Sequence, residues 1–178
     1  MDKKDEYLML REEILHLDTI INNTINFFYA FMASYIAFAL TQDDTIFLLL
    51  SYMIILPAYL IVLSKIQGMS KIGSYLYVFH EKLNGSIFKW ETRNFEYRKD
   101  NKKGIFANII SSNFPFLFVS ISVMMLFFYN TKWNEICTIY EYIKIIACII
   151  FNFRLLLIMY KNRKIGTIYY ISKWKDIK

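Results

Sequence analysis

Long apolar runs without a charged residue dominate this chain. A helix needs roughly 20 such residues to cross the hydrocarbon core of a bilayer. We therefore predict membrane-spanning helices at residues 22–41, 45–64, 112–131 and 140–160. The fourth span requires Glu141 and Lys144 at one interface and Arg154 near the other, and the alternative is a helix lying in the interface. The pattern predicts an all-α fold, a polytopic membrane protein whose four transmembrane helices form a single domain.

Amphipathic segments flank these spans. Apolar residues recur every three or four positions in residues 1–21, which predicts a cytoplasmic amphipathic helix continuous with the first span, because no Gly or Pro interrupts it. Residues 65–104 show the same period on both sides of Asn84-Gly85 and predict a cytoplasmic helical hairpin. Residues 161–178 form a basic tail typical of an interfacial anchor. The acidic N-terminal segment can pair with the basic hairpin.

The distribution of Lys and Arg predicts the orientation. Most of the 21 basic residues fall in the N-terminal segment, the hairpin and the tail, whereas the two short connections between spans are nearly free of them. Basic residues mark cytoplasmic segments, so we expect a multi-pass protein of the cell inner membrane with both termini in the cytoplasm. Contact with membrane lipids explains the net charge of +6, and we do not expect nucleic acid as a partner.

The composition excludes several other classes. The chain is 56% hydrophobic, and its few Gly, Pro and Cys residues argue against collagen-like, disordered or disulfide-stapled proteins. We expect no cleavable signal peptide, because the first 18 residues carry six acidic side chains. Neither His16 nor His80 lies in a predicted span, and Cys137 and Cys148 do not form a redox motif. The sequence therefore predicts no enzyme, cofactor or metal site.

Polar residues inside the spans are the first candidate functional positions. Asn22, Asn23, Asn26 and Arg154 are candidates for a pore lining or an intramembrane polar contact. The alternatives are hydrogen bonds between helices for the asparagines and, for Arg154, a side chain that extends to the interface. Glu141 and Lys144, three residues apart, can pair on one helix face.

Other positions in the spans have structural interpretations. Small residues predict close helix packing at Ala30, Ala33, Ser34 and Ala37. Pro57 predicts a kink in the second span. Ser111, Ser112, Asn113 and Pro115 resemble the start of a helix, with a capping side chain before a proline.

The hairpin is longer than a connection requires, which indicates a second use. It is either a cap lying against the membrane or a docking surface for a soluble cytosolic protein. The candidate docking residues are Tyr75, Phe79, Trp90, Glu91 and Arg93.

The run from Lys71 to Glu81, followed by Trp90-Glu-Thr-Arg93, resembles a pattern in uncharacterised small bacterial membrane proteins. Some of those proteins are encoded beside phage-defence genes. The resemblance covers about 25 residues and implies a bacterial inner-membrane effector or sensor that works with a cytosolic partner.

Two functional hypotheses follow. The first is a homo-oligomeric membrane effector or channel-like protein, which rests on the polar and small residues of the first span, on Pro57 and on Arg154. A bundle of four helices is too thin to hold an aqueous path alone, so conduction requires several copies. The second is a non-conducting sensor or scaffold that recruits a soluble partner through the hairpin.

Overall fold

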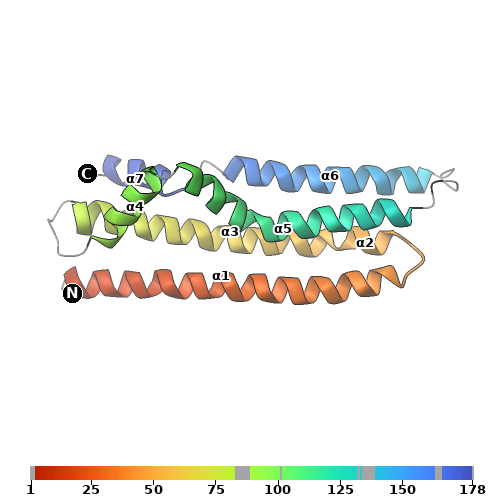
Figure 1. Cartoon of the computed structure of the whole chain (residues 1–178), viewed down its shortest axis with the longest axis horizontal. Helices are drawn as coiled ribbons and strands as arrows, with labels where there is room; N and C mark the ends of the chain where they lie inside the picture. The colour runs from red at the N-terminus through yellow and green to blue at the C-terminus, as the bar shows by residue number, and fades with distance from the viewer. Residues whose placement is uncertain are drawn as a thin grey trace. The chain divides into compact units, whose positions relative to one another are not determined.

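Every regular element of the described chain is a helix. The computed structural model describes residues 3–82, 89–100, 102–131, 133, 139–162 and 166–177, and none of these residues forms a strand. The predicted all-α class is confirmed. The elements in chain order are α1 (Lys3–Leu40), α2 (Ile46–Leu50), α3 (Tyr52–Tyr75), the π-helical segment η1 (Leu76–Lys82), α4 (Trp90–Asp100), α5 (Lys102–Asn130), α6 (Ile139–Asn162) and α7 (Thr167–Asp176) (Figure 1).

Four helical segments are long and apolar enough to cross a membrane. They are Lys3–Leu40, Ile46–Glu81, Asn113–Asn130 and Ile139–Asn162. Their number agrees with the four predicted spans and is compatible with an integral membrane protein. The particular membrane and the orientation of the termini stay predictions.

The first two spans extend into the segments that flank them. α1 runs unbroken from Lys3 to Leu40, which confirms the predicted continuity of the amphipathic segment with the first span. α3 continues past residue 64 to Tyr75 and passes directly into η1. The first arm of the predicted hairpin is therefore an extension of the second span, while the predicted turn at Asn84-Gly85 lies outside the described residues.

The predicted helix start before the third span is wrong. α5 begins at Lys102 and contains Pro115 in its interior. Proline costs one backbone hydrogen bond, but a break within a membrane span would leave several backbone groups without partners. Pro57 likewise lies inside α3, and the kink expected there stays a prediction.

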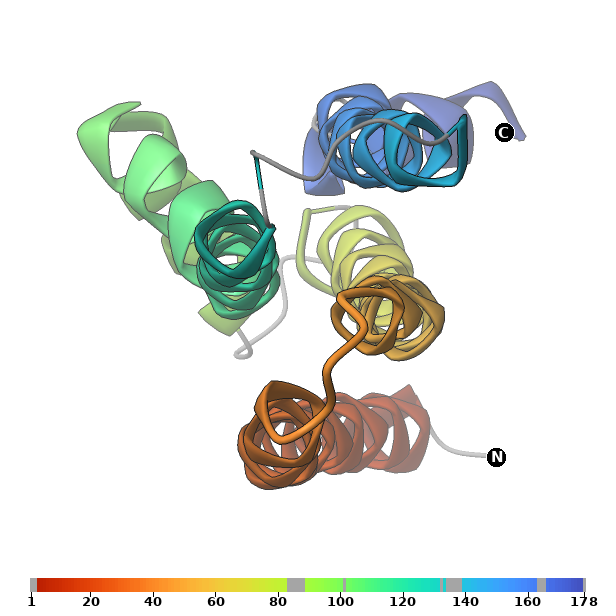
Figure 2. The same ribbon diagram turned by 90° about the vertical axis from the view of Figure 1, so that its right-hand side faces the viewer.

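The chain divides into two compact units. The apolar unit comprises Thr24–Ile61 and Ser112–Lys161, and the charged unit comprises Met1–Asn23, Val62–Ser111 and Asn162–Lys178. In the apolar unit, α2 and α3 lie between α1 and α6 (Figure 2). Its core is aromatic: Phe116 of α5 is fully buried, with its ring 4.7 Å from that of Phe28 in α1 and 5.3 Å from that of Tyr59 in α3.

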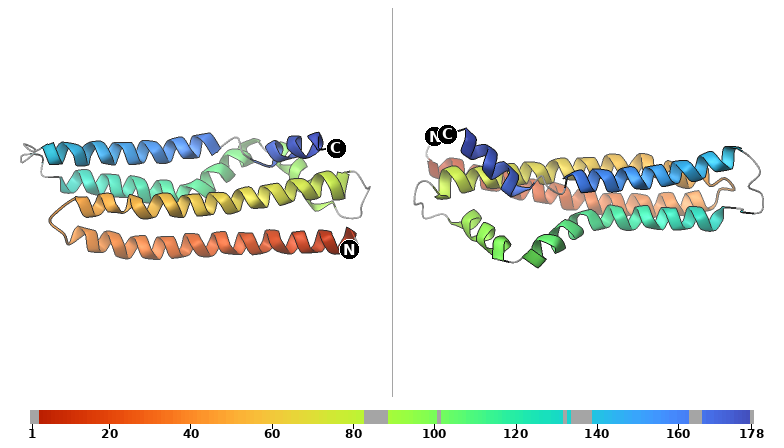
Figure 3. Two further views of the ribbon diagram at one scale, coloured as in Figure 1. Left: turned by 180° about the vertical axis from the view of Figure 1, so that it is seen from behind. Right: turned by 90° about the horizontal axis from the view of Figure 1, so that it is seen from above.

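The charged unit contains helices from both ends of the chain. α7 packs beside the end of α3 and η1 (Figure 3). The indole Nε1–H of Trp174 in α7 donates to Ser74 Oγ at 3.1 Å, and the Trp174 ring meets that of Tyr75 edge-on at 5.4 Å. Gln67 Nε2 donates to Asn162 Oδ1 at 3.1 Å, which joins α3 to the end of α6.

Candidate functional site

A buried carboxylate organises the charged unit. Glu81 of η1 is only 5% exposed and accepts a hydrogen bond from the hydroxyl of Tyr7 in α1 at 3.1 Å. It also accepts the backbone N–H groups of Glu91 at 2.9 Å and Thr92 at 2.6 Å. These N–H groups belong to the first turn of α4, where a negative charge also opposes the positive end of the helix dipole. Glu81 thereby fixes α4 and α1 to η1.

A second carboxylate lies beside this contact. Glu6 Oε1 accepts a hydrogen bond from the hydroxyl of Tyr75 at 2.9 Å, and Glu6 Oε2 lies 3.5 Å from Nε2 of the buried His80. His80 also packs against the ring of Tyr7, with a centroid distance of 6.0 Å. The first turn of α1 is therefore held to α3 and η1 by polar and aromatic contacts together.

The predicted pairing of the N-terminal segment with residues 65–104 includes one ion pair whose signs are the reverse of the net charges of the two segments. Arg11 of α1 pairs with Glu91 of α4 at 3.2 Å, and its guanidinium lies 4.6 Å from the ring centre of Trp90. The positive partner thus comes from the acidic segment and the negative partner from the basic one. Net segment charge is a poor guide here because individual side chains make the contacts.

The apolar unit encloses a small neutral network. Tyr52 Oη donates to Ser120 O at 3.1 Å, Ser120 Oγ donates to Asn152 Oδ1 at 2.7 Å, and Asn152 Nδ2 donates to Tyr52 Oη at 2.5 Å. Asn152 Nδ2 also donates to Cys148 O at 3.0 Å. These bonds join α3, α5 and α6 without burying a charge. Such bonds between helices are the usual way to satisfy polar groups away from water.

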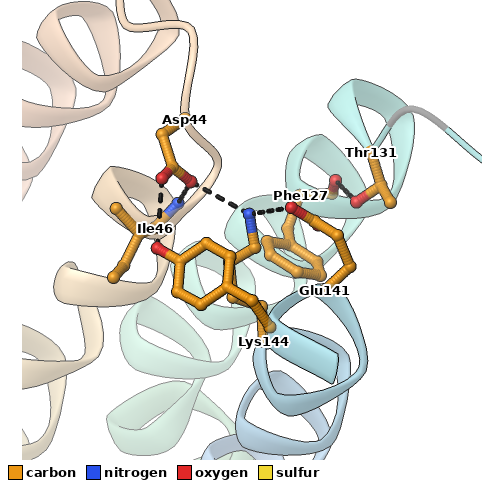
Figure 4. Close-up of polar contacts among 7 residues, drawn as sticks. Asp44, Ile46, Phe127, Thr131, Glu141 and Lys144 are labelled. Carbon is orange, nitrogen blue, oxygen red and sulfur yellow. Dashed lines mark hydrogen bonds and ion pairs between the residues drawn. The ribbon is translucent and has the colours of Figure 1, made fainter. Parts of the chain in front are cut away.

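An ionic clasp lies in the apolar unit where the α1–α2 connection meets the start of α6 (Figure 4). Lys144 Nζ lies 3.0 Å from Asp44 Oδ1 and 2.6 Å from Glu141 Oε1, which confirms the predicted pairing of Glu141 with Lys144. Asp44 also accepts hydrogen bonds from Ile46 N–H at 2.9 Å and from the Tyr140 hydroxyl at 3.1 Å. Burial raises the pKa of the Asp44 carboxyl, but these hydrogen bonds and the charge of Lys144 outweigh it and hold that pKa below its usual range.

The candidate pore residues all lie on the exposed surface of the single chain. Asn22, Asn23 and Asn26 share one exposed face of α1, and Arg154 is exposed on α6. Asn22 donates to Asp18 Oδ2 on the same helix at 3.4 Å. Within the part of the chain that the structure describes, no hydrogen bond or ion pair holds the Arg154 side chain.

The four residues predicted for helix packing lie on the same side of α1 as the three asparagines. All four are exposed in the single chain: Ala30, Ala33, Ser34 and Ala37. The core-facing positions of this helix are instead Phe28, Met32 and Ala39. Any packing role of the small residues therefore requires another copy or another protein.

The candidate docking residues have mixed surroundings. Tyr75 and Glu91 make the internal contacts with Glu6 and Arg11 described above, and Phe79 packs on Tyr75 with a ring distance of 4.9 Å. Trp90 is 57% exposed and Arg93 is exposed. Of this set, the structure leaves mainly the last two side chains on the surface.

Sequence reasoning missed the residues that organise both units. The candidate positions named from the sequence include neither Glu81, Asn152 nor Asp44. A usable signal exists for the clasp, because Asp44, between the first two predicted spans, and Lys144, at the start of the fourth, are opposite charges on the same predicted side of the membrane. No local signal marks Glu81, whose partner Tyr7 lies 74 residues away.

Comparison of the chain with protein-family models, curated proteins and solved structures finds no match. The resemblance to small bacterial membrane proteins, with its link to phage defence, therefore stays a prediction.

Proposed function

We propose that this chain is an integral membrane protein that assembles into a homo-oligomer and acts as a channel-like membrane effector. The observation that carries the proposal is the position of Arg154. It is exposed on a helix apolar enough to cross a bilayer, beside Ile150 and Leu157, which are themselves 55% and 49% exposed. A cation at the centre of a spanning helix costs about 2.5–3.5 kcal/mol, so a polar partner from outside the chain is favoured.

The direction of the side chain supports a partner over extension to the interface. Arg154 lies seven residues before Lys161, so the nearer end of α6 is its C-terminal end. The Cα–Cβ bond of a helical residue tilts toward the helix N-terminus. Reaching the nearer interface would therefore require the side chain to turn back against this tilt.

The exposed face of α1 is a suitable partner. The Asn26 amide oxygen can accept a hydrogen bond from a guanidinium, and the small residues on the same face allow close approach of another helix. Asn26 lies eight residues after Asp18, the last charge before the span. At 1.5 Å per residue, Asn26 and Arg154 are each about 10–12 Å from the charged end of their own span, hence at similar depth.

The two residues cannot meet within one copy. The apolar-unit portions of α1 and α6 lie on opposite sides of α2 and α3 (Figure 2). Contact between α1 of one copy and α6 of the next is head-to-tail, and such contacts close into a ring when the rotation between copies permits. Rings of this kind are the arrangement that the proposal requires.

Conduction would occur between copies. The centre of the described apolar unit is filled by Tyr52, Phe116 and Phe127, all fully buried. A path for ions must therefore run outside this core, where the exposed Asn22 and Asn23 offer polar groups on the same helix face as Asn26.

The test of assembly is a residue swap. Purified protein in nanodiscs is examined by single-molecule photobleaching for the number of copies. We expect Asn26→Leu and Arg154→Leu to reduce that number, and the double swap Asn26→Arg with Arg154→Asn to restore it. Phe27→Leu, at an exposed neighbouring position, is the matched control. A wild-type protein that stays monomeric at every protein-to-lipid ratio contradicts the proposal.

The test of conduction is ion flux from liposomes at defined protein-to-lipid ratios. We expect flux in the wild type and a change of at least severalfold in Arg154→Ala. Assembly without flux under any condition would reject the channel-like part alone.

A second candidate function is a scaffold that recruits a soluble protein. The exposure of Trp90 and Arg93 on α4 favours it. We expect Trp90→Ala with Arg93→Ala to abolish cross-linking to a cytosolic partner in intact cells, while Trp133→Ala, at an exposed position outside the charged unit, leaves it unchanged.

A further inference from the structure

A groove of about 500 Å³ opens in the charged unit between α1 and α3. Its volume falls within the range of small-molecule sites. Glu6 and Glu13 line the groove from α1, and Lys65 and Lys71 line it from α3. Apolar side chains, including Leu17, complete the lining. The groove therefore has acidic residues on one helix and basic residues on the other.

Most of these charges are available to a ligand. Glu6 is engaged by Tyr75 and His80, but within the described residues Glu13, Lys65 and Lys71 form no ion pair. Charges of opposite sign that face each other without pairing suit a ligand that itself carries both signs.

The aromatic end of the groove is rigid. Trp174 and Tyr75 line it, and their rings meet edge-on at 5.4 Å. The Trp174 indole is fixed by its hydrogen bond to Ser74.

The position of the groove along its helices indicates where such a ligand comes from. Lys65 directly follows the uncharged stretch 45–64, so on α3 the groove begins where the apolar span ends. A Cβ atom at Gly68 would lie 3.6 Å from Leu17 Cδ1, which places these two residues opposite each other. Glu13 precedes Leu17 and so lies farther from the span than Lys65. From the span outward, the groove offers Lys65 first, and then Glu13 of α1 and Lys71 of α3 at a similar distance from the span.

We propose that this groove binds the headgroup of a zwitterionic phospholipid with a primary ammonium group. The phosphate lies against Lys65, nearest the span, and the ammonium donates to Glu13 farther out. A headgroup with its phosphate inward and its amine outward matches the order of charges in the groove, whereas an anionic headgroup would place its outer part against the carboxylates. The inference rests on the proposed insertion in a membrane and is independent of assembly or conduction.

The test is lipid retention by purified, delipidated protein in detergent. The protein is incubated separately with dioleoyl phosphatidylethanolamine, phosphatidylcholine and phosphatidylglycerol, and bound lipid is counted by native mass spectrometry. We expect phosphatidylethanolamine to be retained at least fivefold more than the other two. Glu13→Gln and Lys65→Gln should each reduce its retention at least fivefold, and Glu12→Gln, an exposed neighbour outside the groove, should not.

A groove-filling variant provides an independent check. Gly68→Leu should abolish retention with an unchanged circular dichroism spectrum. Equal retention of phosphatidylcholine or phosphatidylglycerol overturns the assignment, as does full retention by Glu13→Gln. If the wild-type protein requires detergent but does not retain phosphatidylethanolamine, this inference alone is rejected. If the protein is soluble without detergent, the proposed function is rejected as well.

Discussion

The two units bury their polar groups in opposite ways. The apolar unit closes a ring of neutral hydrogen bonds through Tyr52, Ser120 and Asn152. The charged unit instead buries the carboxylate of Glu81 and satisfies it with one hydroxyl and two backbone N–H groups. Both arrangements leave few groups without a partner, but they use different chemistry.

The surroundings explain the difference. A buried charge is tolerated when hydrogen bonds and nearby water stabilise it, and its cost grows as water is removed. Neutral groups in a closed network carry no such charge penalty, so they suit helices that would lie in hydrocarbon. The ionic clasp is the exception in the apolar unit, because Lys144 is a buried charge; its partners Asp44 and Glu141 lie near the helix connection, with side chains 40% and 26% exposed.

Removing the buried carboxylate should have the largest effect on this comparison. Glu81→Ala leaves the Tyr7 hydroxyl and the first N–H groups of α4 without their acceptor, and we expect a loss of about 2–4 kcal/mol in the unfolding free energy of the charged unit. Hydrogen exchange of α4 measures this loss. Glu96→Ala, an exposed carboxylate on the same helix, is the control. Equal exchange in the two variants would contradict the capping role of Glu81.

Breaking the ionic clasp should cost less. Lys144→Met removes the shared partner of Asp44 and Glu141, which are partly solvated, so we expect a loss of about 1–3 kcal/mol. Unfolding by SDS titration in mixed micelles measures it. Lys161→Met, an exposed lysine on the same helix, should change stability little. A similar loss of stability in both variants would show that removing a positive charge from α6, and not breaking the clasp, is responsible.

Opening the neutral network should have a smaller effect. Asn152→Leu removes three hydrogen bonds but buries an apolar side chain, and bonds between membrane helices contribute about 0.6–1.7 kcal/mol. The same SDS titration should show a loss in this range. Asn130→Leu, an exposed asparagine bonded only to its own helix, is the comparison. An effect as large as that of Glu81→Ala would remove the contrast between the units.

Two glycines test the packing of the charged unit. A Cβ atom at Gly68 would make an ordinary contact with Leu17 at 3.6 Å, whereas one at Gly73 would press on Glu91 Oε2 at 3.3 Å. We expect Gly68→Ala to raise stability by about 0.5–1 kcal/mol through lower backbone entropy in the unfolded chain. Gly73→Ala should gain less or destabilise, because Glu91 must move relative to Arg11. Thermal unfolding compares the two, and the reverse order would contradict the contact at Glu91.

The pH dependence of the clasp should be the smallest effect. Because the folded-state pKa of Asp44 is lowered, its contribution is fully present above the unfolded-state value of about 4 and is lost as the pH falls through the folded-state value. Asp44→Asn should therefore reduce the stability of the apolar unit less at pH 3, below the unfolded-state pKa, than at pH 7. SDS titration at both pH values measures this, and an equal effect at both would contradict the lowered pKa.

The part of the candidate site that depends on local sequence could be predicted. The pairing of Glu141 with Lys144 follows from a spacing of three residues on a helix. Glu91 and Tyr75 are predicted from the sequence as docking residues for another protein. In the structure they instead contact Arg11 and Glu6 of the same chain, which are 80 and 69 residues away in sequence. Separations of this size depend on how helices pack, and no periodicity in the sequence records them.

The sequence alone determined the helical class, the number of candidate spans and the continuity of α1. These depend on the length of apolar runs and on the absence of breaking residues, which are local properties. Only the tertiary structure decided that α5 continues through Pro115, that Glu81 caps α4 and that Asn26 and Arg154 face outward. Each of these depends on which partners the surrounding helices supply, because a proline, a carboxylate or an amide can be stable in several local settings and the packing selects one.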